Sequence, residues 1–372
     1  MKKKIYLDPG GFYTKVTVFA STEPGDLNSA PDAYSLSGRT FFPTAAVCAP
    51  AQTDRVICYE LNETRYWVGG ACANNRWNCD DESDAGTARN HLIAELVLRK
   101  ALFDYCDSKD EVELFVVVDT PLRRQIFEKV CSQVSSKSCS KVDSTILESE
   151  IAVEGYRGPQ KIRKLLTLKL KILPASDGVL GYVNHIKSGF DLALFVDIGY
   201  SSTKLYVISQ RQGVEKFEMM KLGARFYSDA IERALTEQGI TPLEPYWLMK
   251  QIELGCQAIE VDGDGAGQLK GKPRLFDVSL ILENARWDTN KDFKRMTTDF
   301  ITDYYNATSR WVGLLVVTGG GALFNGELLC AALSDAGYQF DDILIDKSPL
   351  YTVLEGLAQG SLKPTLTPPA YR

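Results

Sequence analysis

Apolar residues along this 372-residue chain fall into runs of two kinds. Runs that are continuously apolar or alternate with polar residues, as in Leu114–Val118 and 165–173, predict β-strands, one buried and one with a solvated face. Longer stretches with apolar positions at helical spacing, as in 82–106 and 287–310, predict amphipathic helices. Because strands and helices alternate in both halves of the chain, the pattern predicts an α/β fold.

Two segments of the chain repeat the same phrase. Residues 5–19 read IYLDPGGFYTKVTVF and residues 194–208 read LFVDIGYSSTKLYVI. They align without a gap, which places Asp8 on Asp197, Gly10 on Gly199, Thr14 on Thr203 and Lys15 on Lys204. Each segment has an apolar run, a turn with glycine and an alternating run, which predicts a β-hairpin. One such hairpin is an ordinary turn, whereas two in matching register indicate a duplicated fold.

The residue types at these turns suit phosphate chemistry. In each hairpin an Asp closes a strand, where its carboxylate can face a metal–phosphate group, and the N–H and hydroxyl groups of the turn can hold phosphate oxygens. A third turn, in 314–324 (LLVVTGGGALF), places three glycines between a buried strand and a helix. Its backbone can lie against a flat group, and the helix N-terminus favours an anion. It matches neither a P-loop nor a dinucleotide fingerprint.

Composition narrows the class of protein. The chain is 45% hydrophobic and 24% charged with a formal net charge of −6, which is ordinary for a soluble globular protein and gives no basic tail for nucleic acid. No transmembrane run or signal-peptide pattern is found, so we expect a cytoplasmic protein. The nine cysteines are scattered and only His91 and His185 are present, so we expect reduced thiols and neither a zinc site nor a histidine-based nucleophilic mechanism.

These residues together resemble the actin-like ATPase superfamily. DPGGFYTK resembles its first phosphate loop, DIGYSSTK its second and VTGGGALF its adenosine loop, in the same order and spacing. Within the superfamily, FFPTAAV, YWVGGAC, FVVVDTPL, KLGARFYSDAI and SPLYTVLEGL resemble segments of the ParM-like bacterial actins that segregate plasmids. The resemblance covers nearly the whole chain.

The resemblance implies an α/β, actin-like (ribonuclease H-like duplicated) two-domain fold with a nucleotide cleft. Domain I would span 1–185 with a small subdomain at about 25–85, and domain II 186–372 with a small subdomain at about 225–300. A C-terminal helix at about 348–362 would pack back on domain I. The cofactors would be ATP, or GTP in its place, and Mg²⁺.

The resemblance also implies roles for single residues. Asp8 and Asp197 would bind Mg²⁺, directly or through water, because carboxylates are hard ligands for a hard ion. The adenosine would contact Gly319, Gly320, Gly321 and Ala322. The phosphates would be held by Gly10, Gly11, Phe12, Tyr13, Thr14 and Lys15 of the first hairpin and by Gly199, Tyr200, Ser201, Ser202 and Thr203 of the second. Two assignments stay open: Lys204 either joins the site or points outward, and Glu232 either reaches the ribose or lies on a solvated helix face.

One position departs from the family pattern. ParM-like proteins carry Glu or Gln after the proline that ends the strand before the second hairpin, where it orients the attacking water. Here Pro174 is followed by Ala175, which cannot orient water. Ser176 or Asp177 can substitute if the turn is shifted, and otherwise hydrolysis should be slow. The alternative role for Asp177 is a helix cap.

The resemblance implies a head-to-tail homopolymer, because a heterologous interface that does not close generates filaments. It also implies a centromere-binding adaptor protein as partner, contact with DNA only through that adaptor, and no membrane. The main alternative is a small-molecule, sugar-type kinase on the same fold. A chaperone ATPase would need a peptide-binding domain, and a membrane-tethered actin homologue an amphipathic terminal helix, and neither feature is found.

Overall fold

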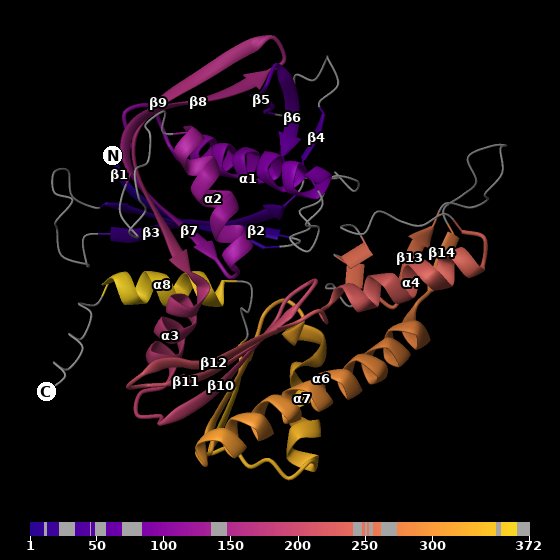
Figure 1. The fold of residues 1–372 in the computed structure, drawn as a ribbon. Helices are drawn as coiled ribbons and strands as arrows, with labels where there is room; N and C mark the ends of the chain where they lie inside the picture. Colours follow the sequence, from indigo (N-terminus) through magenta and orange to yellow (C-terminus); the bar gives the residue numbers. More distant parts are fainter. Residues whose placement is uncertain are drawn as a thin grey trace, which may run out of the picture. The chain divides into compact units, whose positions relative to one another are not determined.

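The computed structural model describes residues 1–10, 13–21, 34–44, 46–48, 57–68, 84–134, 147–240, 248–249, 251–252, 256–261, 274–346 and 351–362 (Figure 1). Gly11, Phe12 and the segment 363–372 therefore lie outside the described residues. The chain divides into two compact units. Unit 1 holds Met1–His185 and, among the described residues, Val353–Leu362; unit 2 holds Ile186–Thr352.

The central sheet of unit 1 has six strands in the order β3-β2-β1-β7-β9-β8. The first hairpin, β1 (Lys2–Pro9) and β2 (Tyr13–Ser21), continues antiparallel into β3 (Tyr34–Pro43). On the other side β1 runs parallel to β7 (Glu111–Val118), and β7 runs parallel to β9 (Gln160–Pro174). The strand β8 (Leu147–Arg157) pairs antiparallel with β9 at the edge. Because β1, β7 and β9 are parallel, their carboxyl ends lie side by side along one edge of the sheet, which runs across the strands.

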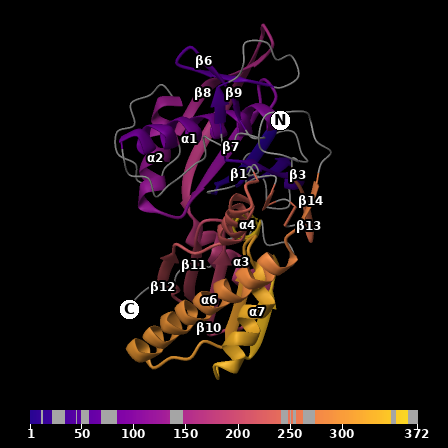
Figure 2. The ribbon, with the colours of Figure 1, turned by 90° about the vertical axis from the view of Figure 1, so that its right-hand side faces the viewer.

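The core of unit 1 lies between this sheet and two helices. Alternate residues of β1 and β2, such as Leu7 and Val16, pack with α1 (Asp84–Tyr105) and α2 (Pro121–Val134) (Figures 1 and 2). A second sheet in the order β4-β6-β5 is formed by β4 (Ala46–Cys48), β6 (Thr64–Val68) and β5 (Tyr59–Leu61).

Two more helices cross within unit 1 at glycines. The helix α3 (Ala175–Ile186) follows β9, and α8 (Thr352–Leu362) returns from the far end of the chain. A Cβ at Gly178 would lie 2.3 Å from the carbonyl oxygen of Val353, and one at Gly356 would lie 1.7 Å from that of Gly178. Only glycine allows two helix backbones to approach so closely. An ion pair of 2.7 Å between Arg39 and Glu355 ties α8 to β3.

The sheet of unit 2 repeats the order of unit 1. Its five strands run β12-β11-β10-β15-β16, which matches β3-β2-β1-β7-β9 strand for strand. The second hairpin, β10 (Leu192–Ile198) and β11 (Thr203–Ser209), continues antiparallel into β12 (Gly213–Met220). On the other side β10, β15 (Leu314–Thr318) and β16 (Asp342–Ile345) are parallel. The duplication expected from the two hairpins is therefore present in both sheets.

Helices cover the sheet of unit 2 as well. Leu194 and Val196 of β10 pack with apolar residues of α6 (Ser279–Thr308) and α7 (Ala322–Asp335), which lie on one face of the sheet (Figure 2). The helix α4 (Arg225–Glu237) contacts α6, and a short hairpin is formed by β13 (Ala258–Val261) and β14 (Arg274–Asp277).

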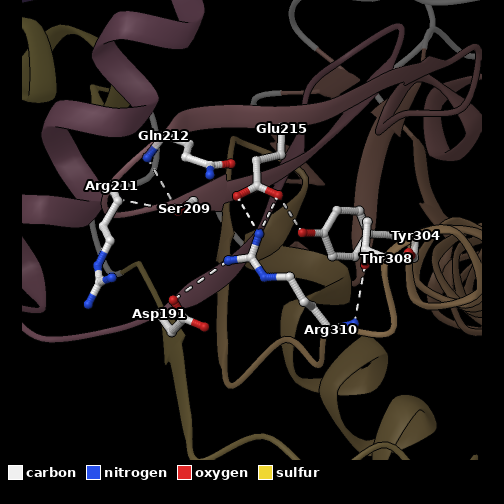
Figure 3. Close-up of polar contacts among 8 residues, drawn as sticks. All are labelled: Asp191, Ser209, Arg211, Gln212, Glu215, Tyr304, Thr308 and Arg310. Atoms are coloured by element: carbon white, nitrogen blue, oxygen red, sulfur yellow. Dashed lines mark hydrogen bonds and ion pairs between the residues drawn. The ribbon is translucent and has the colours of Figure 1, made fainter. Parts of the chain in front are cut away.

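A polar cluster ties α6 to the starting end of this sheet (Figure 3). Arg310 Nη1 donates to both carboxylate oxygens of Glu215 at 2.8 Å, and the Tyr304 hydroxyl donates to Glu215 at 2.5 Å. Arg310 also lies 3.6 Å from Asp191. Burial pushes the pKa of Glu215 upward, but the hydrogen bonds from Tyr304 and Arg310 outweigh it and hold the pKa below its usual value. Burial and the Glu215 charge raise the pKa of Tyr304 to about 12.

Candidate functional site

The first hairpin places Asp8 and Lys15 side by side. They are cross-strand partners in the β1–β2 register, and Lys15 Nζ donates to Asp8 Oδ2 at 3.1 Å. At the turn, a Cβ on Gly10 would lie 2.7 Å from the carbonyl oxygen of Tyr13, so glycine is needed there. The hydroxyl of Thr14 is buried and bonds that of Thr44 at 2.9 Å. The structure thus brings a carboxylate and an ammonium group to one turn.

The second hairpin repeats the arrangement. Asp197 and Lys204 are cross-strand partners, and their charged atoms lie 3.6 Å apart. A Cβ on Gly199 would lie 2.8 Å from the carbonyl oxygen of Ser202, close to the value in the first turn. None of the hydrogen bonds found among the described residues uses the backbone N–H groups of Ser201 and Ser202. Such successive donors in a turn form an anion-binding concavity.

Backbone hydrogen bonds from α4 fix the second turn. Ala224 and Arg225 donate their N–H groups to the carbonyl oxygens of Gly199 and Tyr200 at 2.9 and 2.7 Å. The hydroxyl of Thr203 donates to Leu222 at 2.7 Å. These three hydrogen bonds attach the turn to the segment 222–225. They therefore fix the backbone that carries the N–H groups of Ser201 and Ser202.

The third glycine turn lies against Asp197. Asp197 is paired with Thr318 across β10 and β15, so Gly319 follows directly at the same sheet edge. A Cβ on Gly319, whose φ is +84°, would lie 2.4 Å from Asp197 Oδ1, which excludes a side chain there. Gly321 donates its N–H to Ile198 at 2.8 Å, and α7 begins at Ala322. The helix N-terminus thus stands beside the second hairpin, where its dipole favours an anion.

Two groups of hydrogen-bonded side chains connect this turn, and the helix that follows it, to other segments of unit 2. The hydroxyls of Thr318 and Thr352 bond each other, and Thr352 donates to Asp346 at 2.6 Å. On α7, the buried amide oxygen of Asn325 accepts from the hydroxyl of Tyr227 on α4, and burial raises the pKa of that hydroxyl to about 12. Both groups join segments that are distant in the sequence.

Ser176 and Asp177 lie in the first turn of α3, in unit 1. Pro174 ends β9 opposite Val118 of β7, two strands from β1, so the start of α3 lies at the same sheet edge as Asp8. The helix begins at Ala175, so Asp177 is its third residue and does not occupy the cap position. Loss of solvation raises the pKa of Asp177 above its usual value.

Within unit 2, the structure brings together Asp197, the turn 199–203, Lys204 and the turn 319–321. Within unit 1, it places Asp8, Gly10, Lys15 and the start of α3 at one sheet edge. Glu232 is half-buried on α4, where its charge, after that of Asp229, adds to the raised pKa of Arg225. Its role toward a ribose stays a prediction.

The residues present fit a nucleotide with Mg²⁺. Each hairpin offers a carboxylate of the kind that Mg²⁺ prefers and an ammonium group for phosphate oxygens. At the Gly319 turn a Cβ would meet Asp197 and the backbone of Ile198, so glycine lets this turn pack directly on the second hairpin. Among the described residues no group of three or more His, Cys, Asp or Glu side chains is arranged to hold a metal ion without further ligands.

Sequence reasoning missed three features of the site. It left Lys204 undecided, whereas the cross-strand register pairs it with Asp197. It did not find the attachment of the second turn to 222–225 or the groups around Thr352 and Asn325. The lysine could have been assigned from the equal spacing of Asp and Lys in the two repeats, whereas the other contacts join distant segments and leave no signal in a single sequence.

Two further findings concern the described part of the chain as a whole. No helix within it is long and apolar enough to cross a lipid bilayer. Five of its cysteines, Cys58, Cys106, Cys131, Cys256 and Cys330, form no disulfide.

Comparison with known proteins identifies the fold. No protein-family model matches the sequence, and no curated protein matches it. A 15-stranded ParM filament from Clostridium botulinum matches with a TM-score of 0.63 and 12% identity, over 97% of this chain and 99% of that chain. ParM with ATP from Bacillus thuringiensis matches with a TM-score of 0.58 and 16% identity, over 96% and 97%. An archaeal actin homologue in complex with ADP matches with a TM-score of 0.58 and 14% identity, over 96% and 98%.

Identities this low show the fold and no more. Because each match covers nearly the whole of both chains, the likeness includes both duplicated halves and not one shared domain. This confirms the fold expected from the three glycine turns. The chain has the duplicated α/β fold of the actin-like proteins, shared with ParM and with an archaeal actin homologue.

Proposed function

We propose that this chain is an actin-like ATPase that binds ATP with Mg²⁺, hydrolyses it and assembles head-to-tail with copies of itself into filaments. One observation carries the proposal. On an actin-like fold, both halves present the same hairpin, with an Asp and a Lys paired across the strands beside a glycine turn. A fold that needed the hairpins only for packing would have no reason to keep a charged pair at both turns.

The structural neighbours support the choice of ligand and of assembly. One is a ParM with ATP, another an archaeal actin homologue with ADP, and a third a ParM filament. By analogy, we propose that the turns 10–15 and 199–203 hold the phosphates and that Gly319–Ala322 contact the adenosine. Asp8 and Asp197 would then bind Mg²⁺ or its water ligands, as carboxylates commonly do.

For hydrolysis, we assign the positioning of water to Asp177 in preference to Ser176. Ala175 is buried and has no polar group, and Asp177 is the first carboxylate after it, at the sheet edge that carries Asp8. A carboxylate with a raised pKa is better able to accept a proton at neutral pH than an ordinary Asp. The cellular role that we propose is segregation of plasmid DNA in the cytoplasm, through an adaptor protein bound to centromere DNA.

Right-angle light scattering with ATP and Mg²⁺, followed by pelleting and electron microscopy, tests the proposal. We expect scattering to rise on addition of ATP and to decay as phosphate is released, and GTP in parallel reports the base preference. The double variant Asp8→Ala/Asp197→Ala should abolish the rise. Lys187→Met is the matched control, because it removes an exposed ion pair with Asp342 at the opposite sheet edge.

Other results would contradict the proposal in distinct ways. A stable scattering signal with no phosphate release would remove the ATPase and keep the filament. ATP turnover that requires an added sugar, with no polymer, would favour a kinase. If Asp177→Asn releases phosphate at the wild-type rate while Ser176→Ala does not, the assignment of the water-positioning residue is wrong.

A further inference from the structure

Lys204 occupies in unit 2 the place that Lys15 occupies in unit 1. Each lysine is the cross-strand partner of the Asp that ends the preceding strand. Their charged atoms lie 3.1 Å from Asp8 and 3.6 Å from Asp197, and all four side chains are between 13% and 21% exposed. The second lysine therefore has the same kind of cross-strand partner as the first, at ion-pair distance where the first also donates a hydrogen bond.

The surroundings of the two pairs are also alike. Asp197 and Lys204 lie on the sheet face that carries Phe195 and Tyr206, whose rings meet edge to face at 6.0 Å. Asp8 and Lys15 lie on the face that carries Tyr6 and Phe19, whose rings meet edge to face at 5.9 Å. Strand neighbours of Lys204, Thr203 and Leu205, are fully buried on the opposite face. The two Asp–Lys pairs therefore lie on faces of their sheets that carry aromatic residues on the same strands.

We propose that Lys204 is a second phosphate-binding lysine, so that this chain binds the polyphosphate of a nucleotide in the absence of a divalent cation. The inference rests on the proposed nucleotide binding and goes further, because it concerns how the site balances charge. In the second hairpin, Asp197 alone would leave the turn negative, whereas Asp197 and Lys204 together sum to zero. The N–H groups of Ser201 and Ser202 add donors beside Lys204, so this turn can accept phosphate oxygens before a divalent cation is present.

The alternative is that Lys204 only neutralises Asp197 and keeps it in place. The two roles differ in what happens when Asp197 loses its charge. A lysine that contacts phosphate still contributes to nucleotide binding in the Asp197→Asn background. A lysine that acts only through Asp197 has nothing left to neutralise there, so its removal changes nothing.

The experiment measures the affinity of the full chain for a fluorescent ATP analogue by anisotropy, with EDTA and then across a titration of Mg²⁺ at constant ionic strength. We expect wild type to bind in EDTA and Lys204→Met to bind at least about tenfold more weakly there, the size of one charge-assisted hydrogen bond. With saturating Mg²⁺ the loss should shrink to about threefold or less, because the cation supplies the missing charge. Lys204→Arg should restore binding in EDTA.

The double variant Asp197→Asn/Lys204→Met, compared with Asp197→Asn alone, separates the two roles. We expect the loss in EDTA to persist in this background. Lys187→Met, which removes another Lys–Asp pair of unit 2 at the opposite sheet edge, should leave binding unchanged. Thermal unfolding of each variant shows that the fold is retained.

Three outcomes would overturn the inference. One is wild-type affinity of Lys204→Met in EDTA, and a second is the disappearance of its effect in the Asp197→Asn background. In both cases wild type still binds nucleotide with Mg²⁺, so the proposed function survives. The third is the absence of nucleotide binding by wild type with or without Mg²⁺, which would overturn the proposed function together with this inference.

Discussion

The two hairpins share a register and differ in what holds them. In unit 1, Thr14 of the first hairpin bonds another side chain, the hydroxyl of Thr44. In unit 2, Thr203 at the matching position bonds a backbone carbonyl, that of Leu222, and the N-terminus of α4 closes on the turn. The glycine turn of β15 then packs on Asp197. The second hairpin is thus built into its surroundings through the backbone.

Comparing the two hairpins shows which of their features follow from the repeated sequence and which follow from other segments of the chain. Seven cross-strand pairs in each hairpin, and the position of the Asp–Lys pair, follow from the local sequence, because both copies have them. The fixing of the turn follows from segments elsewhere in the chain. We therefore expect substitutions in the supports of the second hairpin to act through backbone geometry, and those in the first to act through single side-chain contacts.

The largest effect is expected at Gly319. Gly319→Ala would place a Cβ 2.4 Å from Asp197 Oδ1 at a φ of +84°, so either the turn or the Asp must move. We expect a loss of about 3 kcal/mol or more in the free energy of unfolding, and loss of nucleotide binding. Chemical denaturation and the anisotropy titration measure the two effects.

Gly337→Ala is the control for this substitution. Gly337 has a φ of +88°, but nothing lies within 4 Å of its Cβ position. It should cost only the backbone strain, about 1 kcal/mol, and leave nucleotide binding intact. Equal losses in the two variants would mean that strain alone, and not contact with Asp197, explains the glycine at 319.

The next prediction compares how β12 in unit 2 and β3 in unit 1 are tied to a helix. In unit 2, β12 is tied to α6 through Glu215, which accepts from both Arg310 and Tyr304 (Figure 3). In unit 1, β3 is tied to α8 through one partly exposed ion pair, Arg39–Glu355. We expect Glu215→Gln to cost about 1 to 2 kcal/mol and Glu355→Gln less than about 1 kcal/mol. Denaturation of both variants under the same conditions makes the comparison.

The pH dependence of the free energy of unfolding tests the contribution of Glu215. Because the folded-state pKa of Glu215 lies below its ordinary value, its contribution is fully present above the unfolded pKa. That contribution is lost as the pH falls through the folded pKa. Wild type should therefore lose stability more steeply than Glu215→Gln once the pH falls below about 4.3, the ordinary pKa of a Glu. Parallel curves for the two proteins would contradict the assignment of the lowered pKa to this cluster.

A smaller effect separates the two threonines. Thr203→Val leaves the carbonyl of Leu222 without its hydroxyl donor and should cost about 1 kcal/mol. The double variant Thr14→Val/Thr44→Val removes both members of a buried pair and should be nearly neutral. If the double variant is the more destabilised of the two, side-chain contacts matter as much to the first hairpin as backbone contacts do to the second.

The smallest effect on stability is expected at Asp177. Its pKa is raised, so the charged form is disfavoured in the folded state and its cost is present above the folded pKa. Asp177→Asn removes that cost and should raise the melting temperature slightly at neutral pH, while slowing phosphate release. A lower melting temperature would indicate that the carboxylate serves the helix dipole of α3.

Local pattern predicted the strands, the hairpins and the duplication, since these depend on residues close in sequence. It placed the long helix of unit 2 at 287–310, whereas α6 spans Ser279–Thr308. The first turns of α6 follow directly on β14, and the pattern there, with exposed Leu280 and Trp287, does not show one apolar face. Helical spacing alone therefore could not find where this helix begins.

Residues of the candidate site were predictable where they lie within one repeated segment of the sequence. Asp8, Asp197, Gly10 and Gly199 were assigned to it because they recur in register in the two hairpins. The Arg225–Tyr200 and Tyr227–Asn325 contacts were not, because each joins segments that meet only in the folded chain. Phe12 and Gly11 were assigned to the phosphates by resemblance and stay predictions, since they lie outside the described residues.

The glycine crossing of α3 and α8 has a consequence for synthesis of the chain. Domains are made from the N-terminus at about 5–20 residues per second and usually fold as their own segment emerges. Unit 1 departs from that order, because the helix that packs on Gly178 and Gly181 begins after all of unit 2 has been made. The glycine face of α3 stays uncovered until then. A nascent chain that stops within unit 2 should therefore expose this face, and limited proteolysis of stalled ribosome complexes would detect it before Val353 emerges.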